Sequence, residues 1–102
     1  MGYDIDVVRS SEFDAWIAKL RDLAAVAAIE RRILRLRAGN FGDYKSIGDG
    51  ICELRVHFGP GYRIYFSRCG PYVVLLHCAG DKSTQRSDIE QARQLRRQFP
   101  WQ

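Results

Sequence analysis

The sequence has few of the residues that build metal sites and disulfide frameworks. Its 102 residues include three cysteines and two histidines, and no pair of cysteines has the CxxC spacing. Neither a zinc site nor a disulfide framework is therefore indicated, and we expect free thiols, no metal and no cofactor. Cys78 follows an apolar run and is better interpreted as a small core residue than as a nucleophile.

Long hydrophobic runs, repeats and linkers are also missing. The longest apolar stretches, such as residues 72–76, are far too short to cross a bilayer. A signal peptide has a positively charged segment followed by an apolar one, and the start of this sequence shows no such pattern. We therefore expect one cytoplasmic domain that covers residues 1–102 and does not interact with a membrane.

Arginine is what the sequence has in excess. Sixteen Lys and Arg residues stand against twelve Asp and Glu, and thirteen of the sixteen are Arg. The planar guanidinium fork suits two-point recognition of phosphate better than the point charge of lysine does. Hydrophobic residues make up 46% of the chain, which is typical of folded domains. The composition therefore indicates a folded domain with phosphate as its leading ligand class.

The first part of the sequence predicts a strand and two helices. The strand is expected at Asp4–Val8, and a helix with a small hydroxyl N-cap from Ser11. Asp22 should cap a second helix at Leu23–Arg37, with one apolar face. Its other face carries Arg31, Arg32, Arg35 and Arg37. We interpret these arginines as the solvated side of an amphipathic helix and do not place the active site there.

The rest of the sequence predicts an antiparallel β-meander and a last helix. Apolar and polar residues alternate in four candidate strands, Tyr44–Ile47, Ile51–Phe58, Tyr62–Phe66 and Tyr72–Cys78. Short turns that contain glycine join them. A C-terminal helix should follow the Gly80–Lys82 loop, capped by Ser83 or Thr84, and end at Pro100. The expected fold is α+β, with helices on one sheet face and the other face open to water.

Two neighbouring strands carry the residues of chemical interest. Alternation places Leu54, Val56 and Phe58, with Tyr62, Ile64 and Phe66, on the core face. The opposite face of the first strand should present Glu53, Arg55 and His57, and that of the second Arg63 and Tyr65. Pairing in a hairpin would bring together Arg55, His57, Arg63 and Tyr65.

These side chains suit the attack of a ribose 2′-hydroxyl on the adjacent phosphate. Arginines stabilise charge on the phosphoryl oxygens, and tunable groups move the two protons. Tyr65 is a candidate for stacking on a base or orienting the phosphate. Both His57 and His77 are also consistent with ordinary strand residues. Metal-assisted chemistry is not indicated, because no carboxylate cluster is present.

The segment ICELRVHFGPGYRIYF and the later LLHCAGDKSTQRSDIEQARQL together resemble the RelE/ParE toxin superfamily. The resemblance rests on Glu53-Leu54-Arg55, on Gly61-Tyr62-Arg63 and on the run from Gly80 to Gln85. It covers nearly the whole chain. Within the superfamily, the sequence is most similar to HigB-like addiction-module killer proteins.

This resemblance implies a RelE-like fold and the toxin of a type II toxin–antitoxin system. Such a toxin is neutralised by a cognate antitoxin, often a helix-turn-helix protein, and commonly cuts mRNA on the ribosome. By position, Arg63 resembles a phosphate-binding arginine, Arg55 lies near a strand lysine of RelE, and Lys82 lies where RelE has a basic phosphate contact. The chain departs from RelE in two ways. Glu53 stands near the position of another RelE lysine, and residues 83–94 contain no tyrosine, although RelE carries a catalytic tyrosine there.

The general acid and base therefore stay open between His57, Tyr65 and Glu53. Two other functions are also open. A ParE-like toxin would inhibit DNA gyrase without cutting RNA, and a third possibility is a basic nucleic-acid-binding module. The concentration of Arg, His and Tyr on one strand pair favours the endoribonuclease. The pattern specifies no oligomeric state.

Overall fold

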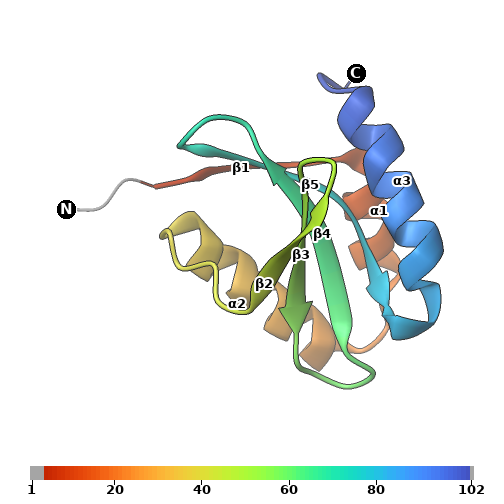
Figure 1. Ribbon diagram of the computed structural model, residues 1–102. Coiled ribbons are helices and arrows are strands. Elements are labelled where there is room, and N and C mark those ends of the chain that lie inside the picture. The colour runs from red at the N-terminus through yellow and green to blue at the C-terminus, as the bar shows by residue number, and fades with distance from the viewer. Residues whose placement is uncertain (1–3, 102) are drawn as a thin grey trace.

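The computed structural model describes residues 4–101 (Figure 1). Within this range, five strands and three α-helices follow one another along the chain. In order they are β1 (Asp6–Arg9), α1 (Ser11–Lys19), α2 (Leu23–Arg37), β2 (Tyr44–Gly48), β3 (Ile51–Val56), β4 (Tyr62–Arg68), β5 (Val73–Asp81), the short 3-10 turn η1 (Lys82–Thr84) and α3 (Gln85–Arg97). The α+β class and this order of elements are as the sequence predicts.

The strands form one mixed sheet in the order β1-β5-β4-β3-β2. Strands β2 to β5 pair in antiparallel fashion with their neighbours in the sequence, so the predicted meander is confirmed. Strand β1 adds to the far side of β5 in parallel, with Asp6 beside Val73. The two outer strands are therefore β1 and β2.

The starts of α1 and α2 follow from side-chain caps. The hydroxyl of Ser10 accepts a hydrogen bond from the Phe13 amide, one residue before the predicted helix start at Ser11. The carboxylate of Asp22 accepts from the amides of Ala24 and Ala25, which confirms the predicted cap of α2. The predicted bounds of α2 are also confirmed.

Helices cover both faces of the sheet, and Figure 1 shows α2 and α3 on opposite sides of it. On one face, α1 and α2 bury their apolar side chains against Leu54, Ile64 and Phe66. On the other face, Ala92 and Leu95 of α3 complete a second core cluster with Ile51, Tyr65 and Cys78. The expectation of a water-exposed second face is therefore wrong, because α3 has its own apolar stripe and buries it there.

Every strand differs from its predicted bounds at one end or both, and the differences at the ends of β3 and β5 matter for the site. Strand β1 begins at Asp6 instead of Asp4. Strand β3 ends at Val56, two residues early, because the chain turns at Phe58, whose carbonyl accepts from the Gly61 amide at 3.0 Å. Strand β5 runs on to Asp81, through the predicted loop. His57 consequently lies outside the sheet, whereas Gly80 lies inside it.

Residues 4–101 fold into a compact body. The radius of gyration is 12.7 Å, close to the value of about 13 Å typical of a domain of 100 residues. None of the helices in the described part of the chain is both long and apolar enough to cross a membrane.

Candidate active site

Antiparallel pairing brings two arginines side by side. Arg55 on β3 lies directly opposite Arg63 on β4, so both side chains extend from the same sheet face. Gly80 on β5 lies opposite Arg63. Next to β3 on its other side, Asp43, which directly precedes β2, accepts a hydrogen bond from the Arg55 amide through its carbonyl at 2.9 Å. We call these four residues the arginine row. The predicted meeting of Arg55 and Arg63 is confirmed.

A buried carboxylate holds the two arginines. Glu53 is fully buried, and its Oε1 lies 3.3 Å from Nε of Arg55, while its Oε2 lies 3.5 Å from Nε of Arg63. The side-chain amide of Gln85, the first residue of α3, donates to Oε2 at 2.8 Å. Such a charge is tolerated in a protein interior only when it is paired and hydrogen-bonded. The hypothesis of Glu53 as a general acid or base loses its support, since both oxygens are occupied and neither meets solvent.

The two arginines are held but still reach the surface. The Arg55 side chain is 34% exposed and the Arg63 side chain 14%. Nε of Arg63 is buried and makes no hydrogen bond, so its contact with Glu53 is an ion pair only. Hydrogen bonds from Ser83, together with the charge of Arg63, lower the pKa of Asp81. The two guanidinium groups of the row thus face two carboxylates, Glu53 and Asp43, so most of their charge is balanced locally.

Lys82 lies at the end of the same strand pair. It begins the η1 turn directly after β5. Its Cε lies 3.6 Å from the position that a Cβ on Gly61 would occupy, so the lysine stem passes over the turn before β4. Gly61 is two residues from Arg63. The structure therefore brings the stem of Lys82 to the turn before the strand that carries Arg63, which fits the shared site that the resemblance implies.

His57 is exposed and lies just beyond the end of β3. Its side chain is 74% exposed, and Nε2 lies 2.6 Å from Oδ2 of Asp43. This hydrogen bond, followed by the charges of Arg55 and Arg32, lowers the pKa of Asp43. An ionised carboxylate only accepts, so Nε2 carries the proton and Nδ1 of a neutral ring is left as an acceptor. The predicted place of His57 on the Arg55 face is wrong because β3 has already ended. Asp43 instead lies between them, with its Oδ1 3.9 Å from Nη1 of Arg55.

Tyr65 has no access to solvent. It shares the face of Arg63, as alternation predicts, but it is fully buried beneath α3 in the second core cluster. Burial, with the negative charges of Glu53 and Asp88, raises the pKa of its hydroxyl. That hydroxyl has no hydrogen-bond partner. The expectation that Tyr65 stacks on a base is therefore wrong, whereas Tyr62 lies in the core as predicted.

Two further sequence candidates are structural. His77 is fully buried with its Nε2 2.7 Å from the Ser67 hydroxyl, and burial followed by the nearby Arg96 lowers its pKa to about 4. Cys78 is buried, its thiol donates to the Asp88 carbonyl at 3.2 Å, and burial raises its pKa to about 12. The interpretation of Cys78 as a core residue and of His77 as a strand residue is confirmed.

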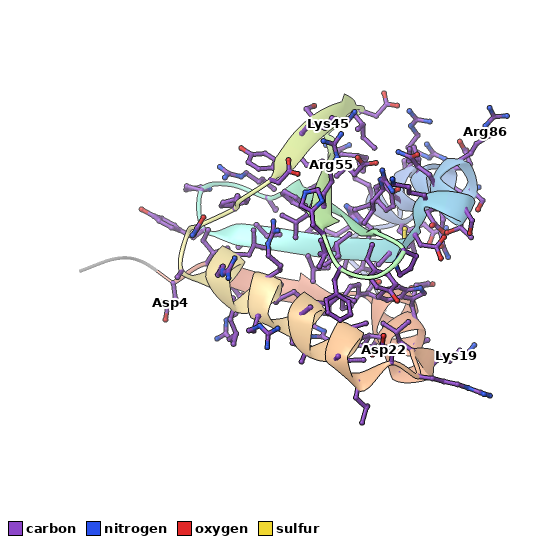
Figure 2. All side chains as sticks on the ribbon, turned by 90° about the horizontal axis from the view of Figure 1, so that it is seen from below. Asp4, Lys19, Asp22, Lys45, Arg55 and Arg86 are labelled. Atoms are coloured by element: carbon purple, nitrogen blue, oxygen red, sulfur yellow. The ribbon has the colours of Figure 1, made fainter. Side chains whose placement is uncertain are left out.

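Sequence reasoning missed three residues around the row, namely Asp43, Lys45 and Gln85. Lys45 on β2 lies opposite Glu53 in the register. Figure 2 shows Lys45 and Arg55 on the side of the sheet away from Asp22 and Lys19. The alternation of polar and apolar residues in β2 could have identified Lys45. Gln85 could have been identified from the run from Gly80 to Gln85, which carries the family resemblance. Asp43 precedes its strand and has no pattern of its own.

A hollow of about 870 Å³ on the described surface touches this site only at Gln85. It is lined by short polar and charged side chains of η1 and α3 and contains neither arginine of the row. We place the candidate site at the two arginines and not in this hollow, because phosphate recognition depends on cations more than on an enclosed volume. Among residues 4–101, no group of three or more His, Cys, Asp or Glu side chains is arranged to hold a metal ion.

Comparison with known proteins identifies a relative. No family model matches the chain, and no solved structure matches it. An uncharacterized protein of Haemophilus influenzae is 50% identical over 91 residues, which cover 89% of this chain and 92% of that protein. The chain belongs to the family of this protein. Membership of this H. influenzae family does not by itself assign an activity, because the relative's description names none.

Proposed function

We propose that the chain is the toxin of a type II toxin–antitoxin system and cuts mRNA on the ribosome without a metal ion. In this proposal it is a RelE-like protein of the HigB-like branch, and its substrate is a translated transcript. One observation carries the proposal. Arg55 and Arg63 stand side by side on the sheet, fixed by a fully buried Glu53, and both retain exposed surface.

The arrangement fits phosphoryl transfer. In the proposed step, the ribose 2′-oxygen forms a bond to phosphorus while the bond from phosphorus to the 5′-oxygen breaks. A base takes the 2′-hydroxyl proton and an acid protonates the departing 5′-oxygen, which leaves a 2′,3′-cyclic phosphate and a 5′-hydroxyl. The negative charge that grows on the phosphoryl oxygens is stabilised by Arg55, Arg63 and Lys82. Donors held in place before the reaction contribute most to such stabilisation.

His57 is our candidate for the general base. Its Nε2 is held by Asp43, so the free Nδ1 is the nitrogen that would accept the 2′-hydroxyl proton. A carboxylate that fixes the tautomer of a catalytic histidine is a recurrent arrangement in enzymes. Asp43 is therefore a positioning residue for both His57 and Arg55. Tyr65 does not enter the proposed chemistry, because it has no exposed surface.

The proposal also implies partners and a location. A ribosome-dependent toxin works in the cytoplasm, on mRNA and the ribosome, and is held inactive by a cognate antitoxin, in this branch often a helix-turn-helix protein. The net charge of +4 favours association with RNA. A small helix-turn-helix reading frame beside the gene would support this part of the proposal.

The second candidate is a ParE-like inhibitor of DNA gyrase without nuclease activity. Two observations favour it. Glu53 neutralises part of the arginine charge near a place where RelE carries a lysine, and residues 83–94 contain no tyrosine where RelE carries one. Both remove groups that the RelE mechanism uses, while a protein that only binds gyrase needs neither.

The experiment follows the ends of a cut transcript. Purified protein is incubated with ribosomes that carry a defined mRNA, and the fragments are analysed for their terminal groups. We expect 5′-hydroxyl ends and 2′,3′-cyclic phosphate or 3′-phosphate ends. A transcript with one 2′-deoxynucleotide at the cut site should resist cleavage there. Fragments with 3′-hydroxyl ends, or cleavage beside the deoxynucleotide, would refute the mechanism. Intact mRNA with trapped gyrase–DNA complexes would favour the ParE-like candidate.

Arg63→Ala is the matched test of the site. We expect the cleavage rate to fall by about 10²- to 10³-fold, as when one preorganised donor is removed. Arg63→Lys, which keeps the charge but not the fork, should lie between that variant and the parent. Arg37→Ala loses the same charge at an exposed position outside the site and should cleave like the parent. Thermal unfolding of each variant separates a loss of chemistry from a loss of fold.

A further inference from the structure

A groove beside the arginine row is lined by cations. It has a volume of about 330 Å³ and lies between α2 and the end of β3. Its lining consists of Ala28, Arg31, Arg32, Arg35, Val56, His57 and Phe58. These residues include three arginines and one histidine but no acid. The arginine face of α2, interpreted above as a solvated surface, therefore forms one wall of a defined groove.

Two of these arginines are unpaired. Arg31 and Arg35 are exposed, and neither makes an ion pair or side-chain hydrogen bond within residues 4–101. Arg9 and Arg93 do have acidic partners, Glu30 at 2.9 Å and Asp49 at 2.8 Å, whereas exposed cations outside the groove such as Arg21, Arg37 and Arg97 also form no ion pair within residues 4–101. Like charges four residues apart on a helix destabilise it slightly. An anion bound between Arg31 and Arg35 would remove this repulsion, and the two side chains share one groove in which to bind it.

Arg32 joins the groove to the active site. Its guanidinium donates to the Arg55 carbonyl at 2.8 Å and to the Phe41 carbonyl at 3.0 Å. It is packed closely enough that a Cβ on Gly42 would lie 2.8 Å from its Nη2. Arg32 is therefore a fixed part of the wall. His57 lines the same groove and shares Asp43 with Arg55. The groove thus begins where the arginine row ends.

We propose that this groove binds the phosphate backbone of the RNA strand next to the cut, with Arg31 and Arg35 each contacting a phosphate. The inference rests on the proposed function, since it makes the groove and the arginine row one continuous track for a single strand. Arginine pairs of this kind contact phosphate without reading sequence. The apolar floor of Val56 and Phe58 is compatible with the sugar and base surface of such a strand.

The test measures binding separately from cleavage. The probe is a fluorescein-labelled single-stranded RNA of 12 nucleotides, bound at several salt concentrations and followed by fluorescence anisotropy. For the double variant Arg31→Ala/Arg35→Ala, the loss of two phosphate contacts should reduce the slope of log K against log salt by about 1.4. At 0.1 M salt this corresponds to a loss of affinity on the order of 20-fold. Both substitutions are at exposed positions, so the fold should be retained.

The control is Arg21→Ala/Arg37→Ala, which removes the same charge outside the groove and should bind RNA like the parent. The inference is overturned if the groove variant binds like this control, or if the parent protein does not bind the RNA. A polyglutamate peptide tests the alternative of an acidic protein partner. The inference is also overturned if this peptide binds the parent more tightly than RNA does and does not bind the groove variant. RNA binding that depends on the groove without any cleavage would instead refute the proposed nuclease and leave the groove assignment standing.

Discussion

Tyr65 carries a hydroxyl that has neither a hydrogen-bond partner nor exposed surface. Removing an unpaired buried hydroxyl costs little, because no intramolecular bond is lost and a desolvated polar group disappears. Tyr65→Phe should change the free energy of unfolding by less than about 1 kcal/mol and leave the cleavage rate within about twofold of the parent. Denaturant unfolding and the mRNA cleavage assay check the two results. A hundredfold loss of rate in a stable variant would restore Tyr65 to the catalytic site.

The same residue shows what alternation can and cannot predict. Period-2 spacing correctly places Tyr65 and Arg63 on one sheet face and Tyr62 on the other. It does not predict that α3 covers most of that face, since coverage depends on how the last helix packs. Two residues on the same sheet face consequently differ in solvent exposure. Tyr65 enters the core, while Arg63 keeps some exposed surface near the start of α3.

Gly80 lets helix α3 begin against strand β5. A Cβ at this position would lie 1.9 Å from Oδ2 of Asp88 and 2.5 Å from Oγ1 of Thr84. Gly80→Ala should therefore displace the first turn of α3 and weaken the bond from Gln85 to Glu53. We expect a loss of about 1–3 kcal/mol in the free energy of unfolding, typical of overpacking, together with reduced cleavage.

A second substitution controls this prediction. Asp88→Ala removes the nearest clashing group, so Gly80→Ala/Asp88→Ala should be more stable than the sum of the two single effects predicts. Denaturant unfolding of the four proteins gives this coupling as a double-mutant cycle. Strictly additive effects would contradict the steric explanation.

Element boundaries were predictable where a local signal sets them. The bounds of α2 follow from the Asp22 cap and the apolar period of its sequence. The ends of β3 and β5 do not follow from such signals. The apolar pattern of β3 continues to Phe58, but the turn that starts there removes His57 from the sheet. Strand β5 extends through Gly80 because pairing with Arg63 outweighs the turn tendency of glycine.

At the scale of the whole molecule, His77 couples folding to pH. Its pKa is about 4 in the folded state and about 6.5 as a free side chain. Above pH 6.5 the residue is neutral in both states. As the pH falls from 6.5 to 4, the unfolded chain binds a proton that the folded chain does not, so stability decreases, by up to about 3 kcal/mol from this group.

The measurement is the free energy of unfolding at several pH values for the parent and for His77→Gln. The variant lacks the titrating ring, so the difference between the two proteins should grow as the pH rises from 4 to 6.5. An equal pH dependence in both would show that His77 is not the group responsible. His57→Gln is the matched control, because it removes the exposed histidine and leaves the buried one in place.

Strand β5 pairs with both β1 and β4, although it is the last strand of the sheet in the chain. As the protein is synthesised from its N-terminus, β1 has no partner until residues 73–81 have left the ribosome. Lys82 and Gln85 follow later still, and Gln85 donates the hydrogen bond to the buried Glu53. A nascent chain that already displays Arg55, Arg63 and Glu53 therefore still lacks the Gln85 hydrogen bond to the Glu53 carboxylate. The arginine row becomes a finished site only after the first turn of α3 has emerged and folded, so the order of synthesis delays the activity proposed for it.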